Sequence, residues 1–411
     1  NSPLLVLAGA GSGKTRVITH KIAWLVDDYG VKPTQIAAIT FTNKAAKEMK
    51  ERVGKLIGAR AEGLIVSTFH ALGVRILRQE AAKVGLKPGF SILDAADTTA
   101  LFQELAGNVD KGRLRALQSR ISLWKNQLTE PAAALANAAD DIESAAAQLY
   151  AAYERTLRAY QAVDFDDLLR LPVKLFTEND EVAQRWRSRL WHVLVDEYQD
   201  TNRAQYRLLQ LLTQGRDSFT AVGDDDQSIY AFRGANVANM QHFERDFGRG
   251  GMPVRLIKLE QNYRSQGNIL DAANALIKNN RGRLGKTLWT DAGAGEAIRV
   301  FDAFSDIDEA RFVVDEAREL LRDGFTRNQI AVLYRSNAQS RVLEHQLFTA
   351  AVPYRVYGGL RFFDRQEIKH ALAYLRLIGN PDDDTAFTRV VNFPTRGIGS
   401  RSVDALHEAA H

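Results

Sequence analysis

A glycine-rich run near the beginning of the chain has the residue types and spacing of a phosphate cradle. Residues 8–15 read AGAGSGKT and lie between an apolar run and an amphipathic pattern. The three glycines let the backbone curl so that its N–H groups face an anion, and the positive end of the following helix adds to the attraction. Lys14 is expected to reach the β- and γ-phosphates, and the Thr15 hydroxyl to coordinate Mg²⁺. The candidate cradle residues are Ala8, Gly9, Ala10, Gly11, Ser12, Gly13, Lys14 and Thr15.

A second candidate lies far along the chain, where the apolar run 193–195 ends in two carboxylates, Asp196 and Glu197. A Mg²⁺ ion near the cradle needs an oxygen ligand from a neighbouring strand, and Asp196 is placed to supply it directly or through its water shell. Glu197 could polarise the attacking water. Together the two patterns favour hydrolysis of a nucleoside triphosphate. A kinase uses similar phosphate chemistry, so transfer to another acceptor stays open.

The pattern of apolar residues predicts the scaffold that must position these groups. Short apolar runs alternate with helical patterns at 15–26 and 44–57, which is typical of an α/β fold with a parallel sheet and crossover helices. From about 70 to 190 the pattern is helical and rich in alanine, without a convincing strand. We therefore expect a helical block inserted into one α/β domain, and a second α/β domain after it. The expected strands are residues 4–7, 36–40, 64–67, 193–195, 219–222, 256–259, 298–301 and 330–334.

Composition limits the possible classes of protein. Of the 411 residues, 45% are hydrophobic and 25% are charged, as in an ordinary globular chain. The absence of cysteine excludes disulfides and thiolate zinc sites and agrees with a reducing cytoplasm. No apolar run reaches the roughly 18 residues of a membrane span. Residues 16–60 and 326–376 each carry five more basic than acidic side chains, which indicates either contacts with a polyanion or solvated helix faces.

The residues that follow the two carboxylates extend the second motif. Residues 196–202 read DEYQDTN, which resembles the corresponding motif of the superfamily 1A DNA helicases, the UvrD/PcrA/Rep group. The segments WKN at 124–126 and NPDDD at 380–384 look closest to the Rep branch. Further motifs resemble that family in its own order over essentially the whole chain: ITFTNKAA at 39–46, STFH at 67–70, VGDDDQSIYAFRGA at 222–235, QNYRS at 261–265, and YGG, FF and EIK between 357 and 369.

The resemblance implies RecA-like P-loop NTPase motor domains with inserted helical subdomains, in agreement with the helical block. It assigns residues 1–68 and 191–258 to motor domain 1A, 69–190 to the helical insertion 1B, 259–357 to the first part of motor domain 2A, and 358–411 to the start of helical domain 2B. It also implies ATP and Mg²⁺ as cofactors, 3′-to-5′ movement on single-stranded DNA, and duplex unwinding.

The resemblance further implies roles for residues around the nucleotide. Gln227 looks like the sensor of the γ-phosphate, and Arg264 like the arginine that reaches this phosphate from the second motor domain and offsets charge in the transition state. Arg16 and Tyr263 resemble the pair that sandwiches the adenine. Without the motif, an exposed helix arginine and a packing aromatic would be the simpler interpretations. The expected catalytic residues are Lys14, Asp196, Glu197, Gln227 and Arg264.

Aromatic and polar residues match the family's DNA-contacting positions. Phe41, Tyr230 and Phe232 match positions that stack or pocket bases, and such stacking is worth about 1–3 kcal/mol per base whatever the sequence. The position of Phe232 is usually tryptophan in the family, so its stacking is expected to be weaker. A lone histidine is more often structural than functional, so His70 has a simpler alternative. Further strand-contacting positions are His70, Arg233, Arg335 and Asn337.

Compared with the family, the chain is expected to be a fragment truncated at both ends. The family's upstream glutamine motif would precede Asn1, and motifs V and VI would follow His411. Two alternatives to a complete helicase therefore stay open: a fragment that binds ATP and single-stranded DNA without unwinding, and the motor part of a helicase–nuclease subunit. The expected partners are single-stranded DNA, single-strand/duplex junctions and replication or repair proteins, in the cytoplasm at the nucleoid. The oligomeric state is left open.

Overall fold

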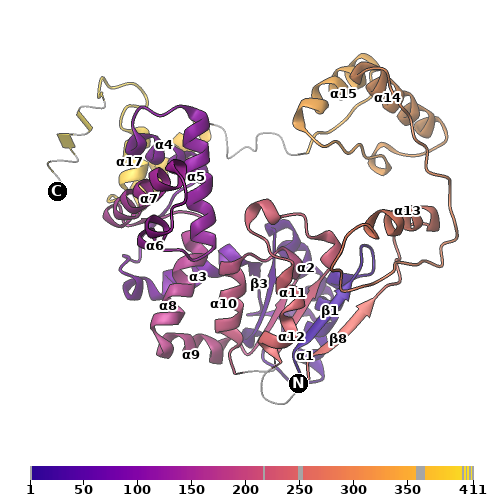
Figure 1. Ribbon diagram of the computed structural model, residues 1–411, viewed down its shortest axis with the longest axis horizontal. Coiled ribbons are helices and arrows are strands. Elements are labelled where there is room, and N and C mark those ends of the chain that lie inside the picture. Colours follow the sequence, from indigo (N-terminus) through magenta and orange to yellow (C-terminus); the bar gives the residue numbers. More distant parts are fainter. Residues whose placement is uncertain are drawn as a thin grey trace. The chain divides into compact units, whose positions relative to one another are not determined.

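The computed structural model describes residues 2–215, 218–248, 253–357 and 366–399, together with positions 402, 403, 405, 406 and 409. The chain divides into two compact units (Figure 1). The first comprises Asn1–Gly295 and Ala373–His411, and the second comprises Glu296–Leu372. Each unit is described below by itself.

The first unit is built on a six-stranded sheet in the order β3-β2-β6-β7-β1-β8. Every neighbouring pair is parallel, so that Leu4 pairs with Thr220 on one side and with Arg255 on the other. Buried strands of a parallel sheet read as continuous apolar runs, which explains why the sequence located β1, β2, β6 and β7; the edge strand β8 is largely exposed. The expected α/β fold is confirmed. The strands are β1 (Leu4–Ala8), β2 (Ile36–Thr40), β3 (Ile65–Thr68), β6 (His192–Val195), β7 (Phe219–Gly223) and β8 (Arg255–Leu259).

Helices cover both faces of this sheet. On one face, α1 (Lys14–Asp27) and α2 (Asn43–Ile57) bury apolar residues against Val6, Ala38 and Val222. On the other face, the core joins the strands to helices that lie far apart in the sequence. These helices are α3 (Phe69–Glu80), α8 (Asp167–Glu178), α9 (Asp180–Arg189) and α10 (Arg203–Thr213).

The helical block between β3 and β6 is confirmed and has a hydrophobic core of its own around Tyr150 and Tyr153. In Figure 1 its helices α4–α7 gather in a lobe beside α3 and α8. Two short strands, β4 (Ser91–Ile92) and β5 (Ala162–Val163), pair in parallel within the block, so the expectation of no strand there is wrong. A two-residue strand is too short to show an alternating pattern. The helices are α4 (Ala95–Ala106), α5 (Lys111–Asn126), α6 (Pro131–Ala136) and α7 (Asp141–Ala159).

A buried ion cluster joins this lobe to α8. The Lys125 ammonium lies 2.9 Å from Glu154, 2.7 Å from Asp164 and 3.0 Å from Asp167, and its side chain is inaccessible to solvent. Arg170 pairs with two of the same carboxylates. Burial alone would lower the pKa of Lys125, but the three carboxylates outweigh it and raise that pKa. Removing one partner from such a cluster would leave an uncompensated buried charge. The cluster therefore ties the lobe to α8.

The other α-helices that lie wholly within the described part of the first unit are α11 (Ala238–Gln241), α12 (Phe243–Phe247), α13 (Gly267–Ile277) and α17 (Asp384–Val390). Arg389 of α17 pairs with Asp97 at the start of α4. Helix α16 (Gln366–Gly379) crosses the division between the two units. None of the described helices is long and apolar enough to cross a lipid bilayer.

The second unit contains α14 (Asp306–Arg322) and α15 (Asn337–Thr349). The expected strands at 298–301 and 330–334 are wrong, since both segments are described without helix or strand. A strand needs a hydrogen-bonded neighbour, and none is present among the described residues of this unit. Apolar side chains of both segments are exposed, Val300 to 92% and Leu333 to 94%.

The assignment of residues to the four domains 1A, 1B, 2A and 2B stays a prediction. Its boundary at 258–259 falls within β8, a strand of the first sheet, and residues 260–295 belong to the same compact unit as that sheet. Residues 358–365 of the expected 2B segment, which include the Gly358-Gly359 and Phe362-Phe363 pairs, lie outside the described residues.

The crossing of α3 and α8 provides a test of the fold. A Cβ added at Gly73 would lie 1.8 Å from the backbone carbonyl oxygen of Leu168, which has no room to move. We expect Gly73→Ala to lower the free energy of unfolding by about 1–3 kcal/mol, measured by chemical denaturation. Gly54→Ala on α2 is the matched control, because no atom lies within 4 Å of its added Cβ. It should raise stability by up to about 1 kcal/mol; equal effects at both positions would contradict the described packing.

Candidate nucleotide-binding site

The predicted nucleotide residues of the first unit lie in loops at one edge of the sheet. Parallel strands end along the same edge, and ligands of open α/β sheets bind there. The glycine-rich run follows β1, Asp196 and Glu197 follow β6, and the acidic turn before Gln227 follows β7. The segment 261–265 follows β8. Residues separated by up to 252 positions are thereby brought into contact.

The glycine-rich run forms a tight loop between β1 and α1, as predicted. Gly11 and Gly13 have φ of 68° and 94°, in the left-handed region that favours glycine, and Gly13 caps the first turn of α1. The Ser12 hydroxyl donates a hydrogen bond to the Gly9 carbonyl at 2.8 Å and closes the loop. The helix begins at Lys14, so its unpaired N–H groups lie at the loop.

The structure brings this loop and the end of β6 together. Lys14 Nζ lies 2.8 Å from Glu197 Oε2, and Thr15 Oγ1 lies 3.5 Å from Asp196 Oδ2. A hydroxyl and a carboxylate oxygen at this separation are ligands of the kind that Mg²⁺ prefers. The residues therefore fit a Mg²⁺-bound nucleotide.

The two carboxylates differ in their surroundings. Asp196 is 4% exposed, and its burial, followed by the charge of Glu197, raises its pKa to about 6. A carboxylate that is costly to ionise gains most from a cation beside it. Glu197 has φ of 51°, which is uncommon for a residue other than glycine and marks a backbone held by its context. Gln199, which the sequence analysis did not select, donates a hydrogen bond to Glu197 Oε2 at 2.9 Å.

The QNYRS segment lies directly on the glycine-rich loop. Asn262 Nδ2 donates to the Ala10 carbonyl at 2.6 Å, and the Tyr263 N–H donates to the Gly11 carbonyl at 3.0 Å. Asn262 is 2% exposed, and a Cβ at Gly11 would lie 2.6 Å from its Nδ2. Asn262 thus fixes the loop. The sequence analysis included it only as a member of the QNYRS motif and assigned it no role. Tyr263 is exposed at this position, with the Arg264 side chain next to it in the sequence.

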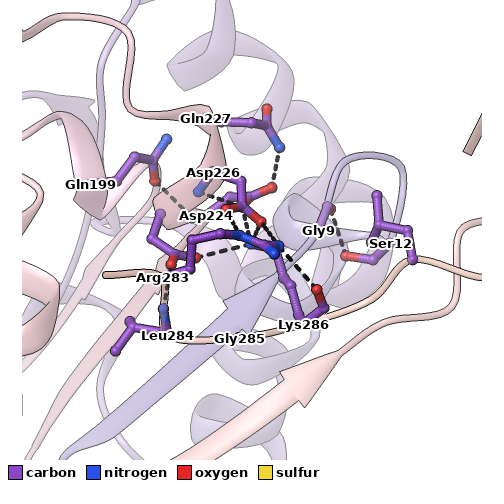
Figure 2. A network of polar contacts seen from close by, with 12 residues as sticks. Gly9, Ser12, Gln199, Asp224, Asp226, Gln227, Arg283, Leu284, Gly285 and Lys286 are labelled. Atoms are coloured by element: carbon purple, nitrogen blue, oxygen red, sulfur yellow. Dashed lines mark hydrogen bonds and ion pairs between the residues drawn. The ribbon is translucent and has the colours of Figure 1, made fainter. Parts of the chain in front are cut away.

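The proposed roles of Arg16, Tyr263 and Arg264 stay predictions. All three residues are exposed, and no hydrogen bond or ion pair of either guanidinium is found in the part of the chain that the structure describes. The Tyr263 hydroxyl donates to Gln261 at 2.9 Å. Gln227 donates through Nε2 to Asp224, its neighbour in the acidic turn (Figure 2).

Aromatic rings gather at two of the predicted DNA-contacting positions. The rings of Tyr230 and Phe232 lie 6.0 Å apart, and the Arg233 guanidinium lies 5.5 Å from each ring centroid. Phe232 is 77% exposed and so presents a free face. Phe41, by contrast, is partly buried against the core, with its ring 6.1 Å from that of Phe69.

The remaining candidates differ in what the structure shows of them. The His70 ring stacks on Phe165 at 3.9 Å, and Phe165, which was not selected from the sequence, is 59% exposed. Burial lowers the pKa of His70 to about 4, so at neutral pH this ring offers a hydrogen bond or a stacking face but no charge. Arg335 and Asn337 belong to the second unit and are exposed there.

Comparison with known proteins identifies two family models. Residues 1–248 match the UvrD/REP helicase N-terminal domain, and residues 257–411 match the UvrD-like helicase C-terminal domain. The chain is 48% identical over 413 residues to DNA helicase II of Escherichia coli, covering 100% of this chain and 57% of that protein. It is 48% identical to ATP-dependent DNA helicase Rep of the same organism, covering 99% and 61% of the two chains.

A third relative is ATP-dependent DNA helicase PcrA of Staphylococcus aureus, 45% identical over 99% of this chain and 56% of that protein. The chain thus spans about three-fifths of the length of these relatives. Because the identities to Rep and to DNA helicase II are equal, a closer likeness to the Rep branch stays a prediction.

The partly buried His70 predicts a pH dependence of stability. Its pKa is lowered to about 4 in the folded chain from an ordinary value near 6.5, so the unfolded chain binds the proton first as pH falls. This contribution is present above pH 6.5 and is lost as pH falls towards 4. At pH 5 we expect His70→Gln to recover about 2 kcal/mol relative to its effect at pH 7.5, measured by urea denaturation. The same substitution at exposed His20 is the matched control; an equal recovery there would contradict the assignment.

Proposed function

The chain belongs to the UvrD/REP helicase family, and from that premise we propose that it forms an ATP-driven motor that moves 3′-to-5′ on single-stranded DNA and unwinds duplexes. The observation that carries the proposal is the convergence of two loops at the sheet edge. Lys14 and Thr15 from one loop meet Glu197 and Asp196 from the other, at 2.8 and 3.5 Å. Among the functions compatible with a P-loop, this convergence supports hydrolysis of a nucleoside triphosphate.

In the proposed site, Thr15 and Asp196 hold Mg²⁺, and the backbone N–H groups of residues 9–13 hold the phosphates. Bound Mg²⁺ supplies positive charge to the phosphate oxygens. Lys14 pairs with Glu197 in this structure, and the phosphates of ATP compete for the same ammonium. Once Lys14 turns to the phosphates, Glu197 keeps its hydrogen bond from Gln199 and loses the ion pair on the same oxygen, so that its carboxylate can accept a proton from the attacking water.

Gln227 and Arg264 complete the proposed catalytic set, and Arg16 and Tyr263 the adenine site. Arg264 follows a segment that hydrogen-bonds the glycine-rich loop, so its guanidinium is tethered within reach of that loop while remaining exposed. An arginine in this position offsets charge that develops on the γ-phosphate.

For DNA, the exposed ring of Phe232 beside Tyr230 and Arg233 supports base stacking with a cation nearby. Such contacts tolerate any base, as a translocating motor requires. We include Phe41, His70, Arg335 and Asn337 as further strand contacts, and single-strand/duplex junctions with replication or repair proteins as partners. Acting on DNA, the motor would work at the nucleoid.

Loss of Lys14 tests the ATPase proposal. Lys14→Ala removes the cation that neutralises the phosphates, and we expect the DNA-stimulated turnover number to fall about 100-fold or more, measured as phosphate release with single-stranded DNA. Lys32→Ala, at an exposed lysine away from the sheet edge, is the control and should leave turnover within twofold. Turnover that survives Lys14→Ala would refute the site. An unsubstituted chain that binds ATP and single-stranded DNA without turnover would favour the alternative of a binding fragment.

Substitution of Phe232 tests the DNA surface. Removing a stacking ring costs about 1–3 kcal/mol, so Phe232→Ala should weaken binding to an oligothymidine at least about fivefold by fluorescence anisotropy. Phe232→Trp, with a larger face, should strengthen it. Tyr29→Ala removes a ring that is 49% exposed but lies outside the candidate surface, and it should have no effect.

The affinity of the unsubstituted chain for DNA should also depend on salt. The logarithm of the association constant should fall linearly with the logarithm of the salt concentration, because phosphate contacts release counterions.

A further inference from the structure

A compact ion cluster lies beside the nucleotide residues and is not explained by the proposed site. Asp224, Asp225 and Asp226 follow β7 with carboxylate oxygens within 4.8 Å of one another. Lys286 fills the space between them: its Nζ pairs with Asp224 and lies 2.9 Å from Asp225 and 2.6 Å from Asp226. Arg283 binds Asp226 through two nitrogens, at 2.6 and 2.7 Å. The three carboxylates thus face protein cations (Figure 2).

Asp224 connects this cluster to the proposed catalytic residues. Its carboxylate accepts a hydrogen bond from Gln227 Nε2, and its backbone N–H donates to Gln199 Oε1 at 2.9 Å. Gln199 in turn donates to Glu197 Oε2 at 2.9 Å. Asp224 therefore bonds Gln227, the predicted γ-phosphate sensor, through its side chain. Through its backbone it bonds Gln199, the partner of the predicted base Glu197. Figure 2 shows Gln199 and Gln227 on the two sides of Asp224.

Lys286 is needed for Asp224 to keep this arrangement. The Asp224 side chain is 2% exposed and lies next to two further acidic residues. A buried carboxylate without a counter-charge is costly, and it would turn towards water. That change would weaken the acceptor that fixes Gln227. The Lys286 side chain, itself 2% exposed, supplies the opposite charge.

The strip that carries Lys286 also touches the glycine-rich loop. A Cβ at Gly9 would lie 2.1 Å from Leu288 Cδ2, so the Leu288 side chain packs directly on that loop. The Trp289 carbonyl accepts a hydrogen bond from the Asn262 N–H at 2.7 Å, and Asn262 holds the Ala10 carbonyl. Residues 286–289 thus contact both the turn with Gln227 and the loop that would hold the phosphates.

We propose that Lys286 is a positioning residue for ATP hydrolysis: it holds Asp224, and through Asp224 it sets Gln227 at the place from which the γ-phosphate is sensed. The catalytic consequence rests on the proposed function. The placement of Gln227 by Lys286 does not, and it is measured separately below.

The test combines Lys286→Met, which keeps the length of the side chain without its charge, with Gln227→Ala and with the double variant. Lys286→Met should lower the turnover number about tenfold and leave the dissociation constant of ADP within twofold, because ADP has no γ-phosphate to sense. In the Gln227→Ala background it should cause less than a twofold further loss, since the two residues act in series. Lys286→Arg should restore most of the turnover. Hydrogen–deuterium exchange of the 224–230 segment, without nucleotide, should rise at least fivefold in Lys286→Met.

Lys258→Met is the matched control. Lys258 is an exposed lysine that donates to the carbonyls of Leu284 and Gly285, so it holds the same strip without touching the acidic turn. It should change neither turnover nor exchange of 224–230 by more than twofold. Losses that add in the double variant would overturn the proposal and leave Lys286 a structural brace. Unchanged exchange in Lys286→Met would overturn it as well. An unsubstituted protein without ATPase activity would refute the proposed function alone, and the exchange measurement would still decide the placement of Gln227.

Discussion

The direction of six strands is the constraint on which the rest of the first unit depends. Because all neighbours in the sheet are parallel, every strand ends at the same edge, and each loop that follows a strand meets the others there. The glycine-rich loop, the pair Asp196-Glu197, the acidic turn and the QNYRS segment come from β1, β6, β7 and β8. A single reversed strand would remove one of these loops from the site, whatever its residues.

Two buried charged groups of the first unit, Lys125 and Asp196, differ in whether an opposite charge compensates them. In the helical block, Lys125 is enclosed by three carboxylates and has no exposed surface, so its charge serves packing. At the sheet edge, Asp196 is almost as deeply buried, but the nearest cation, Lys14, pairs with Glu197 instead. That difference in charge compensation, rather than burial itself, separates this structural ion cluster from the proposed Mg²⁺ site. The Asp224 cluster resembles the first case, yet it is hydrogen-bonded to the residues of the second.

Sequence alone predicted the sheet and the two central motifs because both are local patterns. The run 36–39 is apolar throughout, and the spacing of the glycine-rich loop leaves little choice of conformation. It failed at 298–301 and 330–334, where an apolar run predicted a strand but strand formation depends on a neighbour. It assigned no role to Gln199, Asn262 or Lys286, whose partners lie 25, 252 and about 60 positions away. The first two lie within quoted motifs, but the contacts that give them a role follow from the fold.

In the proposed function, the contacts of Glu197 would link nucleotide binding to activation of the base. Its Oε2 atom is shared by the Lys14 ammonium and the Gln199 amide. A phosphate that draws Lys14 away removes the stronger partner, since a charged donor binds a carboxylate more tightly than a neutral amide does. In the proposed mechanism the carboxylate can then accept a proton from the attacking water, while Gln199 keeps it in place. Gln199 also accepts from the Asp224 backbone N–H, so one amide side chain bonds both the predicted base and the acidic turn that carries Gln227.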